Sequence, residues 1–287
     1  MVLDEVWIRE TGQFRSLKTG NTLPAGDDPA VLPYWGAPTF RDEFDGSSID
    51  RDKWVVWDAS THGSLSYDWG YIQANAASIV DGNLRQRMVK RASGINASSK
   101  TRWWDTAYMT TLGKFTQTYG RWEMRAKIPT VAQNSQGVWP AFWLRNTSSG
   151  EIDIMEAWGD PPLNRTRNIN LTETSTHTIH QDTNGGGQSY GVTYEHRVAG
   201  STGSTAYDTA QGFHTWACEY TPDYLRFYFD GVMTANITPT GDTHPMAGAN
   251  ATRDFSWVWG TTFTAPWHVR INLQMGDPYW SSDDGTG

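Results

Sequence analysis

The stretch "YGRWEMRAKIP", residues 119–129, decides the fold. Tryptophan, methionine, alanine and isoleucine occupy one set of alternate positions, and arginine, glutamate and lysine occupy the other. A period of two is expected of a β-strand that buries one face. Alternating segments recur in "IVDGNLRQRMV", "THTIHQD", "FHTWACEYTPDYLRFYFDG" and "HVRINLQMG", separated by glycine, asparagine, serine and aspartate. No stretch combines a helical period with helix caps, so we predict an all-β fold, an antiparallel β-sandwich.

The composition limits the size of the fold and its partners. A chain of 287 residues suffices for one large domain or two modest ones, and we expect one domain over residues 1–287 and a monomer. The net charge is −8 and the 23 lysines and arginines form no cluster, which argues against nucleic acid and anionic membranes as partners. The start is too charged for a secretory leader, and no apolar run approaches a membrane span. Cys218, the only cysteine, is predicted to be a packed thiol.

Three carboxylates interrupt the apolar stretch "SGEIDIMEAWG", namely Glu151, Asp153 and Glu156. On a regular strand Glu156 would point away from the other two. A β-bulge with Ile154 or Met155 as the extra residue would bring all three to one face. The two glutamates could then approach to the ~5–5.5 Å of a retaining glycosidase. From the spacing alone, a solvated acidic face or a cation site remain the alternatives.

Charge repulsion suggests different roles for the three groups. Carboxylates on one face cannot all ionise easily, so at least one pKa must rise, and a group that stays protonated near neutrality is a usable acid. We assign this role to Glu156. Asp153 can share a proton or a hydrogen bond with Glu151, which restrains that group in the ground state and releases it for attack.

The longer stretch "WPAFWLRNTSSGEIDIMEAWG" resembles glycoside hydrolase family 16, whose laminarinase-like members carry E-I-D-x-x-E. Other segments resemble its successive strands in order, from about Phe40 to Trp280. The resemblance implies a jelly-roll (concanavalin A-like) β-sandwich of two antiparallel sheets with a concave substrate cleft. It also implies double displacement with retention, without a cofactor for the chemistry. By position in the motif, Glu151 would be the nucleophile, Glu156 the general acid/base and Asp153 the residue between them.

Sixteen tryptophans suggest a surface for sugars, because indole rings stack on the C–H faces of a polysaccharide. The resemblance places one histidine near the leaving-group side. Arg121, in the strand quoted first, is a further candidate, and a solvated strand face is the alternative interpretation. The predicted substrate-binding residues are Trp139, Trp143, Trp158, His180, Trp103 and Arg121, with Trp104 as a neighbour of Trp103.

The substrate is less defined than the reaction. Many laminarinases carry an Asn-x-Glu-(Leu)-Gln stretch, and the equivalent region here, "YDWGYIQANAASIVDGNL", keeps only the glutamine. We therefore expect an endo-acting hydrolase of 1,3- or mixed 1,3-1,4-β-glucan, with an agar- or carrageenan-type galactan hydrolase or a transglycosylase as the alternative. A non-catalytic β-glucan-binding protein on this sandwich would be expected to lose the carboxylates. Because polymers do not enter cells, we expect extracellular action.

The order of the strands differs from the family pattern. There a last strand reading apolar-Asp-x-Val-x-Val ends the domain, whereas here that pattern lies at the front in "MVLDEVWIRE". We predict a circular permutation, with residues 1–10 as the displaced strand, 11–30 as a linker and 31–287 as the rest of the sandwich. The strand should lie in the convex sheet next to "FRDEF" or "FYFDG". The period-two run Val2, Asp4, Val6 and Ile8 should form this strand, and its apolar side should enter the inter-sheet core. A remnant of a preceding tandem domain or a coincidental strand is the alternative.

The resemblance also implies a structural calcium ion on the convex side. Asp4 would supply a side-chain ligand and Gly82 a carbonyl ligand, with Glu43 as a neighbour. Oxygen-only ligation suits Ca²⁺.

Overall fold

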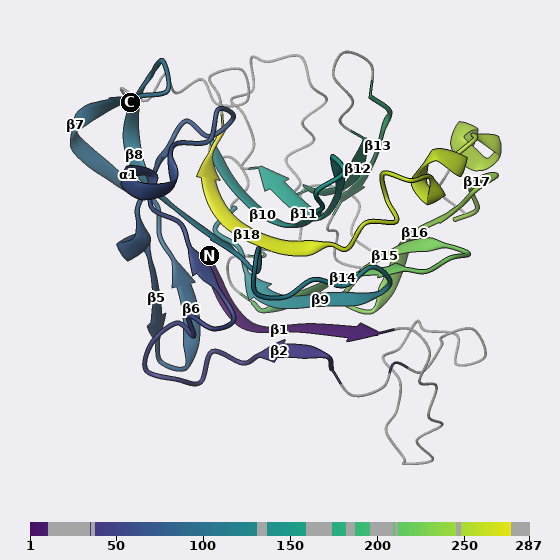
Figure 1. Ribbon diagram of the computed structural model, residues 1–287, viewed down its shortest axis with the longest axis horizontal. Coiled ribbons are helices and arrows are strands. Elements are labelled where there is room, and N and C mark those ends of the chain that lie inside the picture. The colour runs from purple at the N-terminus through teal and green to yellow at the C-terminus, as the bar shows by residue number, and fades with distance from the viewer. Residues whose placement is uncertain are drawn as a thin grey trace, which may run out of the picture.

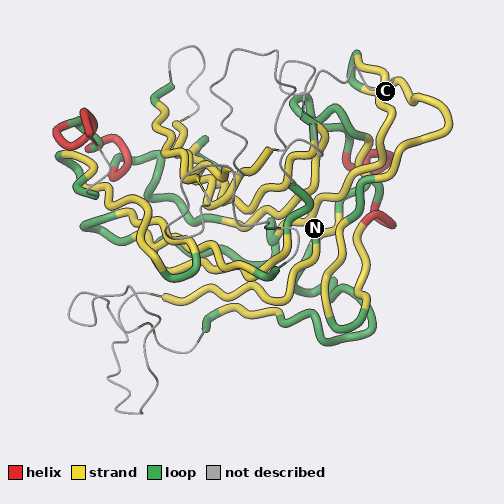
Figure 2. The backbone as a smooth tube through the Cα atoms, turned by 180° about the vertical axis from the view of Figure 1, so that it is seen from behind, coloured by secondary structure: helices red, strands yellow, loops and turns green. Residues whose placement is uncertain are grey.

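The computed structural model describes residues 1–10, 35, 38–130, 137–158, 174–181, 187–195, 209, 212–244 and 248–276. Two antiparallel sheets lie one above the other, with β1 and β2 in the lower sheet and β10, β11 and β18 in the upper sheet (Figure 1). Seen from behind, the described chain consists of strands joined by loops and turns, with short helices at its margins (Figure 2). The predicted jelly-roll sandwich is thereby confirmed.

The first sheet has nine strands in the order β17-β16-β15-β14-β9-β1-β6-β5, and β2 pairs with β1. Its strands are β1 (Val2–Glu10), β2 (Phe40–Asp42), β5 (Ala77–Val80), β6 (Asn83–Gln86), β9 (Gly120–Lys127), β14 (His214–Tyr220), β15 (Leu225–Phe229), β16 (Val232–Thr238) and β17 (Gly241–Asp242).

The second sheet follows the order β13-β12-β11-β10-β18-β8-β3, and β4 and β7 pair with β8. Its strands are β3 (Val55–Val56), β4 (Tyr71–Ile72), β7 (Val89–Ala97), β8 (Lys100–Thr110), β10 (Val138–Arg145), β11 (Gly150–Trp158), β12 (Thr174–Gln181), β13 (Ser189–Glu195) and β18 (His268–Met275). The helices are α1 (Ala59–His62) and the 3₁₀ turns η1 (Ala74–Ala76), η2 (Gly248–Thr252) and η3 (Ser256–Trp259).

The core lies between the two sheets. Trp122 and Met124 of β9 are fully buried, as the alternation predicts, and they belong to the same cluster as Phe142 and Ile152 of the second sheet. Cys218 lies in this cluster as a buried free thiol, which confirms its predicted packing role. In the described part of the chain, no helix has the length and apolar character needed to cross a membrane.

Strand β1 lies inside the first sheet. It pairs with β9 along one edge, and along the other edge with β6 through Val2 and Leu3 and with β2 through residues 6–8. The predicted position next to "FRDEF" is therefore confirmed. The register against β9 shifts between Leu3 and Glu5, so Asp4 lies in a β-bulge.

This bulge corrects the predicted inner face of β1. Leu3, Val6 and Ile8 are fully buried, whereas Val2 and Asp4 are only partly buried. The extra residue exchanges the two faces of the strand at its N-terminal end. The predicted linker over residues 11–30 and the C-terminal end of the chain lie outside the described residues.

Candidate active site

Strand β11 contains the β-bulge that the three carboxylates require. On β10, Phe142 pairs with Met155 and Trp143 pairs with Asp153, so Ile154 is the extra residue. The register against β12 shifts in the same place. Both Ile154 and Met155 are fully buried in the inter-sheet core, which leaves the carboxylates on the opposite face.

A buried histidine holds this bulge. His177 of β12 is 1% exposed, and its Nδ1 lies 2.6 Å from the carbonyl oxygen of Ile154. Its Nε2 lies 2.8 Å from the hydroxyl of Thr234. Burial lowers the pKa of His177 to about 4, so the ring is neutral at pH 7. The geometry fits one tautomer, in which Nδ1–H donates to the bulge carbonyl and Nε2 accepts from the hydroxyl.

Each carboxylate on the outer face of β11 has a different partner. Arg145 Nη1 lies 2.7 Å from Glu151 Oε2, and His180 Nε2 lies 3.3 Å from Asp153 Oδ2. One carboxylate oxygen of Glu151, one of Asp153 and one ring nitrogen of His180 lie within 4.8 Å of one another. The three predicted catalytic residues therefore share one face, and His180 lies beside them.

The third carboxylate, Glu156, is the one of the three whose pKa the site raises. Burial raises its pKa well above the ordinary value, and the negative charges of Asp153 and Glu151 raise it further. Trp139 Nε1–H donates to Glu156 Oε1 at 3.0 Å and opposes this effect without cancelling it. A carboxylic acid kept protonated near neutrality beside an ionised partner can act as a general acid.

Aromatic residues of β10 continue the same face. Trp143 is 6% exposed, and its Nε1–H donates to Asn272 Oδ1 of β18 at 2.6 Å. Arg270 of β18 lies over the Trp143 ring, 4.6 Å from its centroid. Tyr67, from the segment before β4, contacts both Trp139 and Trp143 edge to face, with centroids 6.5 and 6.4 Å apart. Two of the predicted tryptophans are thus brought to the carboxylates.

Two other predicted tryptophans are not joined to this site by any described contact. Trp103 and Trp104 lie on the β7–β8 hairpin, where Trp103 packs against Gly94 and Lys90 Nζ lies 5.9 Å from the Trp104 ring. Trp158 ends β11, and its side chain lies outside the described residues. Their roles stay predictions.

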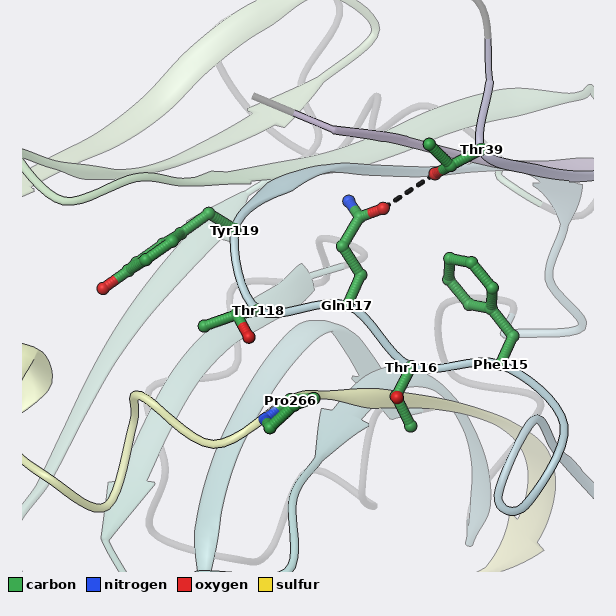
Figure 3. Close-up of a pocket in the computed structure, with 7 residues that line it drawn as sticks. All are labelled: Thr39, Phe115, Thr116, Gln117, Thr118, Tyr119 and Pro266. Carbon is green, nitrogen blue, oxygen red and sulfur yellow. Dashed lines mark hydrogen bonds between the residues drawn. The ribbon is translucent and has the colours of Figure 1, made fainter. Parts of the chain in front are cut away.

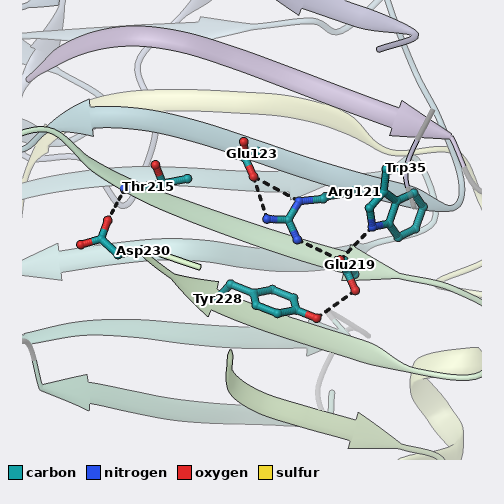
Figure 4. Close-up of polar contacts among 7 residues, drawn as sticks. All are labelled: Trp35, Arg121, Glu123, Thr215, Glu219, Tyr228 and Asp230. Atoms are coloured by element: carbon teal, nitrogen blue, oxygen red, sulfur yellow. Dashed lines mark hydrogen bonds and ion pairs between the residues drawn. The ribbon is translucent and has the colours of Figure 1, made fainter. Parts of the chain in front are cut away.

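Arg121 is placed elsewhere, which corrects its assignment as a substrate contact. It lies on β9 of the first sheet, on the side opposite the buried Trp122, and it pairs with Glu123 and Glu219 at 2.7 and 2.8 Å (Figure 4). Glu219 also accepts hydrogen bonds from Tyr228 and Trp35. Arg121 and its two glutamate partners lie on β9 and β14 of the first sheet, whereas the carboxylates of β11 lie on the second. Arg121 therefore belongs to a structural network.

A hollow of about 420 Å³ is lined by residues other than the three carboxylates (Figure 3). Thr39 donates a hydrogen bond to Gln117 Oε1 across it at 2.7 Å. No carboxylate, histidine or basic side chain is among the residues that line it, which are Thr39, Phe115, Thr116, Gln117, Thr118, Tyr119 and Pro266. The hollow therefore offers no pair of carboxylates for glycoside hydrolysis.

The residues predicted for calcium come from adjoining parts of the first sheet. The pairing of Leu3 with Leu84 places Asp4 beside the turn that contains Gly82, and Glu43 directly follows β2. The carboxylate of Asp4 forms an ion pair with Arg125. Glu43 Oε1 lies 3.7 Å from Arg41 Nε. Oxygen donors are present, but a calcium ion bound to Asp4 would have to displace a guanidinium group.

Sequence reasoning missed four residues of the site. Alternation could have predicted Arg145, because a residue two positions after Trp143 on the same strand lies on the same face. Tyr67, His177 and Arg270 come from other segments, and their place depends on strand pairing.

The comparisons with known proteins agree with this geometry. A family model described as "Beta-porphyranase A-D, GH16 domain" matches residues 36–274. A β-glucanase of Rhodothermus marinus is 27% identical over 294 residues, which cover 97% of this chain and 88% of the relative. β-Porphyranase B of Zobellia galactanivorans is 24% identical, over 70% of this chain and 67% of its own. The laminarinase catalytic domain of Thermotoga maritima superposes with a TM-score of 0.59 at 25% identity, covering 84% of this chain and 87% of that one. The match over most of the chain, on a fold that brings three carboxylates to one face, shows that this chain belongs to glycoside hydrolase family 16.

Proposed function

We propose that the protein is a retaining endo-β-glucan hydrolase that cleaves 1,3- or mixed 1,3-1,4-β-glucan. One observation carries the proposal: the bulge at Ile154 puts Glu151, Asp153 and Glu156 on one face, with the pKa of Glu156 raised. A nucleophile and an acid on the same face are what double displacement needs.

The first step forms a glycosyl-enzyme. Glu156 donates its proton to the glycosidic oxygen while Glu151 attacks the anomeric carbon, and the leaving chain departs as an alcohol. Arg145 holds the Glu151 carboxylate by an ion pair. Asp153, between His180 and Glu151, orients the nucleophile. In the second step Glu156 takes a proton from water, which attacks the anomeric carbon and releases Glu151.

The names of the relatives support a glucan substrate, since one is a β-glucanase and another a laminarinase. A galactan is the second candidate, because the matching family model is described as a porphyranase. Arg270 favours this alternative. None of the interactions that the structure gives this guanidinium is with a carboxylate, so an anionic group on a galactan could pair with it.

Side-by-side assays of laminarin, lichenan, agarose and porphyran test the proposal. Release of oligosaccharides from laminarin or lichenan is the expected result, with the β-anomer formed first in NMR spectra. Glu151→Gly with added azide should give an inverted glycosyl azide. A product of inverted configuration from the wild type contradicts the assignment of the nucleophile, and cleavage of porphyran or agarose alone replaces the glucan by a galactan.

Two further expectations concern the surroundings of this chemistry. Polymeric substrates favour extracellular action, and nothing in the charge favours a nucleic-acid or membrane partner. A structural calcium ion at Asp4 and Gly82 would act on stability and would take no part in the reaction.

We also infer that β1 is the last strand of the family pattern, displaced to the front of the chain. Its place between β9 and β6, with β2 beside it, supports this inference (Figure 1). A variant that carries residues 1–10 behind residue 287, joined by a short linker, should fold with an unchanged melting temperature. Aggregation of that variant, with the original order soluble, would contradict the permutation.

A further inference from the structure

The segment between α1 and β4 is fastened to two strands of the second sheet by a buried carboxylate. Asp68 is fully buried. Its carboxylate accepts hydrogen bonds from the backbone N–H of Gly70 at 2.6 Å, from the hydroxyl of Thr106 at 3.0 Å and from the backbone N–H of Met275 at 3.2 Å. Asp68 therefore ties this segment to β8 and to the end of β18.

A buried arginine fixes the same segment from the other side. Arg102 of β8 is fully buried, and its guanidinium donates to the carbonyl oxygens of Asp68, of Gly70 at 2.7 Å and of Leu65 at 3.0 Å. A Cβ atom at Gly70 would lie 2.0 Å from Thr106 Cγ2, so only glycine allows this close approach. The backbone is thus held on both sides of Tyr67.

The side chain carried by this rigid segment reaches the active site. Tyr67 is 38% exposed, although the next residue, Asp68, is fully buried. Its ring lies edge to face with Trp139 and Trp143, and Trp139 donates to Glu156. The core gains little from an exposed ring, whereas a ring already fixed in place can contact a ligand without a further loss of conformational entropy.

We propose that Tyr67 is a third aromatic contact for the sugar chain, beside Trp139 and Trp143, and that Asp68 is the positioning residue that holds it there. The inference rests on the proposed function and adds a contact to the same site. The apolar ring supplies the contact, because sugar C–H faces pack on aromatic surfaces. Its hydroxyl is dispensable.

Substitution of Tyr67 tests the contact. With the polysaccharide that the wild type cleaves, Tyr67→Ala should lower kcat/KM roughly 10-fold, mainly through KM. Tyr67→Phe should stay within about 3-fold of the wild type, because the ring remains. Tyr119→Ala is the matched control, since Tyr119 lines the hollow of Figure 3, and it should leave kcat/KM unchanged.

Gel retardation by the four polysaccharides separates this inference from the proposed function. Retardation that is lost in Tyr67→Ala and kept in Tyr119→Ala supports the contact even where cleavage is absent. Cleavage by the wild type with an unchanged KM in Tyr67→Ala overturns the inference alone. A wild type that is neither active nor retarded overturns both.

A double-mutant cycle tests the positioning role. Asp68→Asn should raise KM in the wild-type background and leave it unchanged in Tyr67→Ala, although it lowers the melting temperature in both. An equal rise of KM in both backgrounds overturns the positioning role. Should Asp68→Asn fail to fold, Thr106→Val removes one partner of the carboxylate and permits the same cycle.

Discussion

Replacement of His177 by phenylalanine tests whether the β11 bulge controls the active site. The imidazole is stacked on Phe227 with centroids 4.6 Å apart, and phenylalanine keeps a ring of similar shape there. The change removes both hydrogen bonds of the imidazole and leaves the Ile154 carbonyl and the Thr234 hydroxyl buried without their partner. Each such group costs about 1–3 kcal/mol, so the free energy of unfolding should fall by about 2–6 kcal/mol.

The pH dependence of stability gives a sharper signature than this loss alone. The pKa of His177 is about 4 in the folded protein and about 6.5 in the unfolded chain, so the unfolded chain binds the proton more tightly. Its stabilising effect is complete above pH 6.5 and is lost as the pH falls towards 4. The difference corresponds to roughly 3 kcal/mol at pH 4. His177→Phe cannot lose this contribution.

Chemical denaturation at pH 7 and pH 4 measures both effects. The stability gap between the wild type and His177→Phe should be wide at pH 7 and nearly closed at pH 4. At 25 °C and pH 7, kcat should fall at least about 10-fold, because a relaxed bulge displaces Glu156 from its reacting position. His62→Phe, at an exposed position on α1, is the control and should change neither quantity. A stability gap of the same size at both pH values, or an unchanged kcat, refutes the control of the β11 bulge by His177.

Three further predictions address the carboxylates, the aromatic surface and the first strand. Glu151→Gln and Glu156→Gln should each lower kcat by orders of magnitude at an unchanged melting temperature, and Asp153→Asn should cost less; equal losses for all three in steady-state assays would contradict the division of roles. Trp139→Ala should raise KM for long oligosaccharides and shift the basic limb of the kcat/KM profile upwards, because a hydrogen bond to ionised Glu156 is lost; an unchanged profile would contradict that contact. Deletion of residues 1–10 should cause aggregation in light-scattering measurements, because it exposes core surface and two strand edges; a soluble, active product would show that the strand is dispensable.

Alternation predicted which residues of a strand share a face, but it did not predict which sheet the strand joins. Trp122 and Met124 are buried as expected, and Arg121 lies opposite them as expected. The substrate role given to Arg121 failed because β9 belongs to the first sheet, whereas the carboxylates lie on the second. Alternation describes the two faces of a single strand. The sheet that the strand joins depends on its pairing with segments that are distant in the sequence.

Residues that support the site from neighbouring segments were not predictable for the same reason. His177 reaches the carbonyl of Ile154 across 23 positions of sequence, and Tyr67 reaches Trp139 from a segment that precedes β4. Each contact exists because a register or an anchored turn brings the two together. The sequence shows which residues are present, but it does not predict which distant segments pair.

The two β-bulges show how far the chemistry of single residues can locate irregular structure. In β11, regular alternation would direct one of three carboxylates into the apolar core, where an unpaired charge is too costly, and the bulge at Ile154 removes that conflict. The same argument applies to β1. Strict alternation inward from Ile8 and Val6 puts Asp4 in the core, and the bulge at Asp4 turns this carboxylate outward to Arg125. In β1 and β11, an acidic residue at an inner position of the regular alternation therefore coincides with a bulge.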